Sequence, residues 1–349
     1  MLSGTVTIEG LVLTKGFVPD GWVVGGAGLS IRQGSVATVT DCEITLNAAR
    51  NGGGVDMPEA AEATFTDCDI HDNVARTVSA GIGMQRRNKA TFTNCNIYNN
   101  RALAGSSGGG TLAGEVRMEN CRIYDNTASM NGGGLTINGN DRTDPIRSDR
   151  VELVNNIIEG NSAGGHGGGL DLRSTGPVST TGGQIRGNSA NSGGRNIFVT
   201  GTPSQVCLAM SGTTVDGGTE RSDGTSAIEC LASFVSVERA QGATSNMITV
   251  SPGAGTLAEA VGKAQDGDTL ILQDGTYTSA GDRRRVLENL GKRLTIKAFN
   301  RRKAILDGQD RDRVAMLSGT VTIEGLVLTK GFVPDGWVVG GAGLSIRQG

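Results

Sequence analysis

A short unit recurs over residues 39–190 at a nearly constant spacing, and this period limits the possible folds more than any other feature. The copies follow one another every 26 or 27 residues, except for one 35-residue step that holds an insertion. A unit of this size cannot bury its own apolar face, so copies must stack on one another. The six copies are "VTDCEITLNAA" (39–49), "FTDCDIHDNVA" (65–75), "FTNCNIYNNRA" (92–102), "MENCRIYDNTA" (118–128), "LVNNIIEGNSA" (153–163) and "TTGGQIRGNSA" (180–190).

A second pattern, about half a unit away, predicts strands. Glycine turns precede apolar, polar, apolar triplets, as in "GAGLSI" (26–31), "GGGVDM" (52–57) and "GGGLDL" (167–172). This alternation is typical of a strand with one buried face, and 56 glycines with only 3% aromatic residues suit a turn-rich β chain. We therefore predict an all-β fold, a single-stranded right-handed parallel β-helix (a solenoid) with coils of about 26 residues. The right hand is taken from such solenoids in general.

Stacked coils would place the cysteines of successive units above one another, about 4.8 Å apart. We interpret them as small buried thiols, since metal-binding spacings such as C-x-x-C are absent; disulfides or a soft-metal site are the alternative. Cys207 and Cys230 lie outside the frame and could pair with each other. The stacked cysteines are Cys42, Cys68, Cys95 and Cys121.

An asparagine recurs at the bend after each of these strands. A ladder of side-chain amides can bond the backbone of the turns, so we expect a structural role. The six asparagines are Asn47, Asn73, Asn100, Asn126, Asn161 and Asn188. Beside them runs an outward lane that is either a solvated face, which we favour, or a ligand-stacking surface. Its residues are Thr45, His71, Tyr98, Tyr124, Glu159 and Arg186.

The stretch "TLAEAVGKA" (256–264) is the one convincing helix. Thr256 and Glu259 have the spacing of a capping box, and the apolar residues share one face, which predicts an amphipathic capping helix. The helix and the strands that follow it resemble the N-terminal cap and first coils of many right-handed β-helix proteins. Here they lie near the C-terminus.

Residues 1–34 and 316–349 are identical letter for letter. If residues 246–349 are placed before residues 35–245, the chain becomes a conventional β-helix with its cap first. We interpret the chain as an engineered circular permutant with a duplicated coil; a recent natural duplication or a cloning remnant is the alternative. The predicted parts are 1–34 (duplicated coil), 35–200 (regular coils), 201–245 (last coils or cap of the parent), 246–315 (displaced cap and first coils) and 316–349 (second copy).

The permutation predicts contacts between chains. Eight to ten coils would separate the ends of the rod by about 40 Å, so a join at "ERAQGATSNM" (238–247) would be almost fully extended. We expect residues 246–349 of one chain to dock on residues 35–245 of another and to displace the identical segment 1–34. The expected partner is another copy of the chain, in a domain-swapped or head-to-tail oligomer.

The net charge of −3 gives no basic field for nucleic acid. No apolar run approaches the roughly 20 residues that span a bilayer, and the first residues lack a signal-peptide pattern, so we expect a soluble chain. No cofactor is expected.

The pairing of glycine turns with "FTDC" or "FTNC" units resembles the passenger repeats of polymorphic outer-membrane proteins, whose motifs are GGA(I/L/V) and FxxN. "GGAGL" (25–29) and "FTNCN" (92–96) are near matches, and the resemblance covers about residues 35–200. It implies a secreted or cell-surface, adhesin-like and non-catalytic parent with a possible glycan or surface ligand.

The alternative class is a carbohydrate-active β-helix enzyme: a polyuronate lyase, an epimerase or a glycosidase. Such chemistry needs a general base with cations, or paired carboxylates, and the insertion "GNDRTDPIRSDR" (139–150) offers Asp144, Arg147 and Asp149. A solvated, salt-bridged loop is the interpretation we favour there. No metal site is favoured, although carboxylates on neighbouring coils could hold Ca²⁺. These carboxylates belong to Asp41, Glu43, Asp67 and Asp69.

Overall fold

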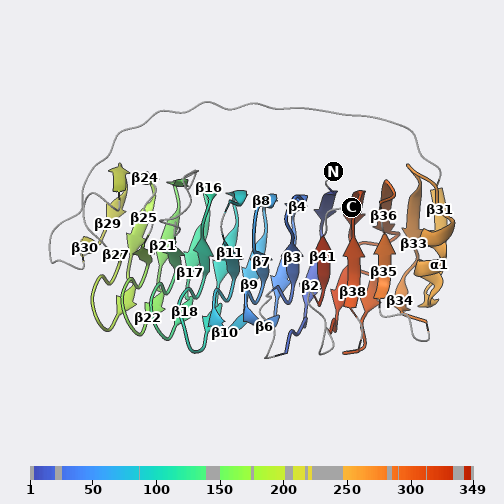
Figure 1. Ribbon diagram of the computed structural model, residues 1–349, viewed down its shortest axis with the longest axis horizontal. Helices are drawn as coiled ribbons and strands as arrows, with labels where there is room; N and C mark the ends of the chain where they lie inside the picture. The colour runs from blue at the N-terminus through green and yellow to red at the C-terminus, as the bar shows by residue number, and fades with distance from the viewer. Residues whose placement is uncertain are drawn as a thin grey trace.

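The computed structural model describes residues 4–19, 26–85, 87–138, 150–173, 177–200, 207–216, 219–221, 247–280, 285–289, 291–311, 313–332 and 342–346. These residues form a rod of stacked coils (Figure 1), and strands at equivalent places in successive coils pair in parallel. Four sheets, here called A to D in the order in which each coil visits them, run along the rod. The predicted all-β parallel solenoid is confirmed.

Sheets A and B have 12 strands each in the described part of the chain. In order along the rod, sheet A consists of β31 (Met247–Val250), β33 (Thr269–Leu272), β36 (Leu294–Ala298), β39 (Thr320–Glu324), β1 (Thr5–Glu9), β4 (Val36–Thr40), β8 (Glu62–Thr66), β12 (Lys89–Thr93), β16 (Glu115–Glu119), β20 (Arg150–Val154), β24 (Pro177–Thr181) and β28 (Cys207–Ser211). Sheet B consists of β32 (Gly253–Ala254), β34 (Gly275–Thr278), β37 (Ala304–Asp307), β40 (Val327–Thr329), β2 (Val12–Thr14), β5 (Glu43–Thr45), β9 (Asp69–His71), β13 (Asn96–Tyr98), β17 (Arg122–Tyr124), β21 (Ile157–Glu159), β25 (Gln184–Arg186) and β29 (Thr214–Val215).

Sheets C and D complete the coils, with six and 11 described strands. Sheet C consists of β6 (Ala48–Asn51), β10 (Val74–Val78), β14 (Arg101–Ala102), β18 (Thr127–Ala128), β22 (Ser162–Ala163) and β26 (Ser189–Ala190). Sheet D consists of β35 (Arg285–Asn289), β38 (Arg313–Leu317), β41 (Leu344–Ile346), β3 (Leu29–Ile31), β7 (Val55–Met57), β11 (Ile82–Met84), β15 (Gly110–Leu112), β19 (Leu135–Ile137), β23 (Leu170–Leu172), β27 (Ile197–Val199) and β30 (Thr219–Arg221).

The corners between sheets A and B depend on single residues in the left-handed backbone conformation. Asp41, Asp67, Asn94 and Asn120 occupy this corner with φ between 50° and 55°. Aspartate and asparagine tolerate this conformation better than other residues with a side chain. The acidic or amide residue before each stacked cysteine therefore has a backbone reason to be there.

The core is one continuous apolar column inside the four sheets. Alternate residues of each strand face it, as in β8, where Ala63 and Phe65 are buried between exposed or half-buried neighbours. Equivalent side chains stack from coil to coil, and the rings of Phe65 and Phe92 lie 4.8 Å apart and almost parallel. Each coil thus fills the apolar face that its neighbour exposes.

Helix α1 (Thr256–Lys263) lies at the end of the rod beside β31 (Figure 1), with Leu257 and Val261 buried. The predicted capping box is wrong. Gly255 holds the N-cap position with φ 75°, so Thr256 is already inside the helix, and the Glu259 carboxylate pairs with Lys263 at 2.6 Å. No helix in the described ranges is long and apolar enough to cross a membrane.

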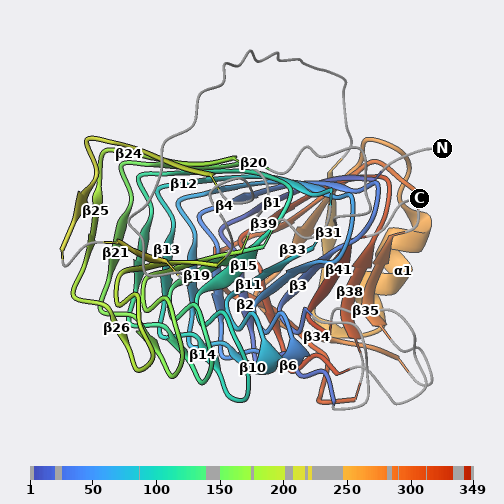
Figure 2. The ribbon, with the colours of Figure 1, turned by 60° about the vertical axis from the view of Figure 1, so that its left-hand side comes forward.

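The two identical segments lie side by side within the rod (Figures 1 and 2), nearer to its helix-capped end, and the ends of the chain marked in Figure 1 lie there too. Strand β1 pairs with β39, β2 with β40 and β3 with β41, each residue opposite its own duplicate. We predicted that the copies would compete for one position, and this is wrong. A solenoid coil accepts another coil on either face, so both copies are stacked as consecutive coils.

The expected strain of closure within one chain also needs correction. Sheet A has 12 strands, which at about 4.8 Å each give a rod of roughly 53 Å. The described strands at its two ends stop at Arg221 and resume at Met247. The 25 residues between them could reach roughly 85 Å at full extension, so their number permits closure. Most of the predicted join at 238–247 lies outside the described residues.

Candidate functional site

The junction between the two copies is the most unusual place in the rod, and regular backbone pairing holds it together. The Thr5 amide donates to the Gly319 carbonyl at 2.7 Å, and the Leu344 amide donates to the Gly28 carbonyl at 3.0 Å. The pairing of β1 with β39 runs without a shift over all five residues, from Thr5 opposite Thr320 to Glu9 opposite Glu324. The junction therefore has the geometry of any other coil interface.

The junction differs from the other coil interfaces because the chain does not run directly from one of its two coils into the other. On one side lies the body formed by residues 4–221, and on the other the body formed by residues 247–346. The side chains on the two facing coils are identical, and their apolar residues belong to the common core. The body 247–346 can therefore form the same contacts with the body 4–221 of its own chain or with that of another chain.

An ion pair bridges the junction on the outside. Arg301, in the turn between β36 and β37, pairs with Asp41 in the corner between β4 and β5, 260 residues away in sequence. Gly10 lies between them with φ 62°, and a Cβ there would lie 2.6 Å from the Arg301 guanidinium. Both partners are more than half exposed, so the pair contributes little stability to the junction.

The outward lane of sheet B contains a continuous aromatic stack. The ring of His71 lies 4.5 Å from that of Tyr98, and Tyr98 lies 4.8 Å from Tyr124, all nearly parallel. The guanidinium of Arg122 covers the ring of Tyr124 at 4.4 Å. Because the ring faces are occupied by one another and by Arg122, a sugar or aromatic ligand finds mainly ring edges here. This favours the solvated, structural interpretation of the lane.

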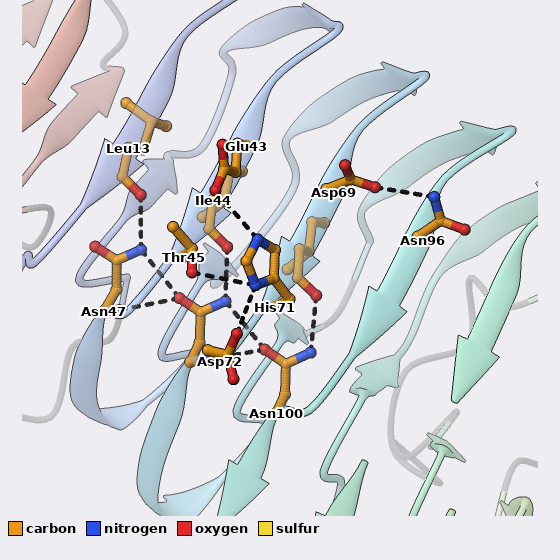
Figure 3. A network of polar contacts seen from close by, with 12 residues as sticks. Leu13, Glu43, Ile44, Thr45, Asn47, Asp69, His71, Asp72, Asn96 and Asn100 are labelled. Atoms are coloured by element: carbon orange, nitrogen blue, oxygen red, sulfur yellow. Dashed lines mark hydrogen bonds and ion pairs between the residues drawn. The ribbon is translucent and has the colours of Figure 1, made fainter. Parts of the chain in front are cut away.

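The polar members of the lane also bond one another. The His71 ring meets the Glu43 carboxylate at 3.3 Å, the Asp72 carboxylate at 2.7 Å and the Thr45 hydroxyl at 3.2 Å (Figure 3). Farther along, Glu159 accepts hydrogen bonds from Arg122 at 2.6 Å and Arg186 at 2.9 Å.

These two arginines hold the pKa of the Glu159 carboxyl below its usual range. A shallow hollow of about 420 Å³ beside Tyr124 is lined by these same paired charges. The lane is thus a ladder of satisfied contacts between coils.

The four carboxylates considered for Ca²⁺ already have partners. Asp41 pairs with Arg301 and Glu43 with His71, while Asp67 and Asp69 accept hydrogen bonds from asparagine side chains of the next coil at 3.1 Å and 2.9 Å. No group of three or more His, Cys, Asp or Glu residues that could hold a metal ion occurs among the described residues. The calcium alternative therefore finds no support in that part of the chain.

The six asparagines form a continuous hydrogen-bonded ladder inside the turns after sheet B. Each side-chain nitrogen donates to the side-chain oxygen of the next asparagine, as from Asn47 to Asn73 and from Asn73 to Asn100, both at 3.0 Å (Figure 3). Each also donates to a carbonyl of the preceding coil, such as that of Leu13 at 3.0 Å. Asn196 ends the ladder by accepting from Asn188 at 2.8 Å. The ladder satisfies turn backbone that the coil stack buries.

The four stacked cysteines are buried free thiols. Each sulfur donates to backbone carbonyls, as Cys68 does to Val39 at 3.4 Å and to Thr66 at 3.2 Å. The contact with the Cys42 sulfur, together with burial, raises the pKa of the Cys68 thiol to about 12. The Cys68 thiol therefore stays protonated, and all four buried side chains pack as small apolar groups.

The raised thiol pKa predicts a loss of stability in alkali. A free cysteine thiol has a pKa of about 8.5. Between this pH and about 12, the Cys68 thiol is therefore deprotonated in the unfolded chain but keeps its proton in the folded chain. We expect the free energy of unfolding to fall as the pH rises through this window. Cys68→Ala should show a shallower fall between pH 7 and pH 10, measured by urea denaturation and taken relative to each protein's own value at pH 7. An equal fall in both proteins would contradict this assignment.

Several candidates lie outside the described residues. These are Asp144, Arg147 and Asp149 of the insertion, the side chain of Cys207, and Cys230. Two features of the structure were not predicted: the Arg301–Asp41 pair, which no periodicity signals, and a polar cavity along sheet D. The sequence signal for the cavity is the departure in "AGIGMQ" (80–85), where Gly83 stands in place of a polar middle residue.

Comparisons with known proteins give the following. A family model described as right handed beta helix region matches residues 3–208. No curated protein matches the chain. Among solved structures, a PL6 family alginate lyase, AlyGC, is 15% identical over 92% of this chain and 57% of its own, with a TM-score of 0.24. An arginine-to-alanine mutant of that lyase is 13% identical over 93% of this chain and 68% of its own, with a TM-score of 0.19.

Proposed function

The chain belongs to the right-handed β-helix family, and on that premise we propose that it is a non-catalytic structural scaffold that assembles with copies of itself by exchanging coils. The supporting observation is the junction of two identical coils, which pair in register without covalent continuity. In the exchanged form, the body 247–346 of one chain stacks on the body 4–221 of another through the same contacts. The order of the coils in the rod, with the helix-capped segment ahead of residue 4, also supports our inference of a circular permutant.

Chain length biases the choice between closure and exchange. A flexible chain of 25 residues has a root-mean-square end-to-end distance of roughly 25–30 Å, about half of the roughly 53 Å that closure must span. The effective concentration of two linked bodies is in the millimolar range when a short flexible linker matches the distance between their sites. It is lower when the linker must be stretched to span that distance. Exchange therefore becomes competitive below millimolar protein.

The geometry of exchange decides the size of the products. The two surfaces that meet at the junction are different faces of a coil, so the contact is head-to-tail. A chain that donates one of its bodies to a neighbour still has a free junction face on its other body. A further chain can dock on that face. Two chains can close by mutual donation, and more chains can extend the series.

Shortening the linker tests this proposal. If residues 227–241 are deleted, ten residues remain between Arg221 and Met247, with a reach of at most about 40 Å. Closure is then impossible while exchange keeps every contact of the rod. We expect light scattering to show dimers and larger species at all concentrations, with a circular dichroism spectrum like that of the full chain.

Two results keep this test open to contradiction. A folded monomer of the shortened chain would overturn the proposal. Deleting residues 1–34 serves as a control: since the copies do not compete, the rod loses one coil and the distribution of masses should change little. A large rise in oligomers would show that the first copy suppresses exchange.

The resemblance to surface passenger repeats supports an adhesin-like parent, secreted or on the cell surface, with a glycan or surface ligand. The enzymatic alternative, a polyuronate lyase, epimerase or glycosidase, would need the insertion at 139–150 to supply its acid, base and cation. Incubation with alginate and polygalacturonate distinguishes the two, since a lyase generates an unsaturated product that absorbs in the ultraviolet. We expect no such absorbance.

A further inference from the structure

The outer face of sheet D differs from the other faces of the rod because its polar residues are covered. In several of its short strands the middle residue is polar, points away from the core and yet is buried: Ser30 is 0% exposed, Asp56 3%, Thr136 4% and Asp171 0%. The turn before each strand covers it closely. A Cβ on Gly52 would lie 2.9 Å from that of Asp56, and one on Gly132 would lie 2.1 Å from the Thr136 hydroxyl.

Two neighbouring coils depart from this pattern. At the middle of β11, Gly83 stands where other strands of sheet D have a polar side chain, so the outer face of the sheet is hollow there. The covering glycine is replaced by Ser79 and Ser107, which keep the left-handed conformation with φ 65° and 69°. A side chain in this conformation carries strain, and glycine inside a strand often marks a place of close approach.

The result is a cavity of about 450 Å³ over β7, β11, β15 and β19, with Arg173 from the coil of β23 at its edge. This volume lies within the range of small-molecule sites. Val78, Met84 and Ala113 give the cavity apolar edges. The rest of its lining is rich in hydroxyl and amide groups.

The polar lining has unused hydrogen-bonding capacity. The Thr111 hydroxyl bonds Ser79 at 2.7 Å and Ser107 at 2.8 Å, which leaves further donor and acceptor sites on these three hydroxyls. Among the described residues, neither the Asn138 side-chain oxygen nor the Thr136 hydroxyl, both buried, has a hydrogen-bond partner. Both residues line the cavity, and a ligand hydroxyl gains the bond to these solvent-closed atoms only where the lining opens to admit it.

Charge restricts the ligand class. Asp56 is one of the residues that line the cavity. Arg173, at the cavity edge, donates through Nε to the buried Asp171 carboxylate at 2.7 Å. The Asp56 carboxylate interacts with the Arg32 guanidinium. An anion would therefore have to compete with a carboxylate for the guanidinium of either Arg32 or Arg173. We propose that the cavity binds a neutral polyhydroxylated molecule of one or two sugar rings, whose hydroxyls meet the Ser, Thr and Asn groups and whose C–H faces meet the apolar edge.

The test uses the full chain with galactose, glucose, mannose and maltose as probes, and galacturonate as the anionic counterpart of galactose, followed by saturation-transfer NMR and titration. Gly83→Val should fill the cavity, because a Cβ there lies 3.3 Å from the Asp56 carboxylate and from Ser79, while the backbone φ suits a side chain. We expect at least one neutral sugar to bind, galacturonate to bind more weakly than galactose, and Gly83→Val to weaken binding at least tenfold. Thr91→Val, on sheet A, is the matched control and should bind normally.

Asn138→Leu provides a second variant in case Gly83→Val does not fold, since it replaces a polar side chain of the cavity lining with an apolar one. It too should weaken binding at least tenfold. The proposal is overturned if no neutral sugar binds, if galacturonate binds more tightly than galactose, or if the folded variants bind as the unmodified chain does. None of these outcomes depends on coil exchange, so this test and the linker test can fail separately.

Discussion

Asn100→Ala is expected to lower the free energy of unfolding by about 3–5 kcal/mol, because it interrupts the asparagine ladder in its middle. The Asn100 side chain is fully buried, accepts from both the backbone and side-chain nitrogens of Asn73, and donates to the Ile70 carbonyl at 2.9 Å. Alanine leaves the Asn73 backbone amide and the Ile70 carbonyl without these partners in a dry turn. Urea denaturation followed by circular dichroism measures the loss.

Asn96→Ala is the matched control for the ladder. Asn96 belongs to the same coil and also bonds a residue of the preceding coil, the Asp69 carboxylate at 2.9 Å, but it is half-buried and water can replace that bond. We expect a cost within about 0.5 kcal/mol. Equal losses in the two variants would show that burial in the ladder is not the cause.

Phe92→Ala is expected to cost about 3–5 kcal/mol through the cavity that it leaves in the core. The Phe92 ring is fully buried and stacks on Phe65 at 4.8 Å, between coils whose backbone pairing prevents collapse onto the hole. Phe299→Ala removes the same ring where it is 70% exposed and should change stability little. Comparable losses in the two variants, measured by urea denaturation, would contradict the packing account.

The sequence allowed the coil and its ladders to be predicted because they follow from a repeating local rule. Asn73 stacks on Asn47, which lies 26 residues earlier in the sequence. Because the ladder repeats at this period, the period alone identifies the stacking neighbours of each residue. The same rule accounts for the buried thiols and the alternating strands. It also predicted the outward lane, although not that the faces of Tyr98 and Tyr124 would be occupied by each other.

What could not be predicted depends on contacts that the period does not specify. The helix start is one example: Thr256 and Glu259 have the spacing of a capping box, but the left-handed Gly255 takes the cap position and shifts the frame. The arrangement of the two copies is another, since identity suggests competition while a solenoid has room for both. The sheet D cavity arises from departures at Gly83, Ser79 and Ser107, which a repeat consensus treats as noise.

Trapping the junction chemically is the most direct test of coil exchange. Thr7 and Thr322 lie opposite each other on the paired strands β1 and β39, so Thr7→Cys with Thr322→Cys should form a disulfide across the junction. Exchange predicts that oxidation yields covalent dimers and larger species whose share rises with protein concentration, resolved on a non-reducing gel. If only cross-linked single chains form at every concentration up to the millimolar range, the junction closes within each molecule and the proposed exchange is wrong.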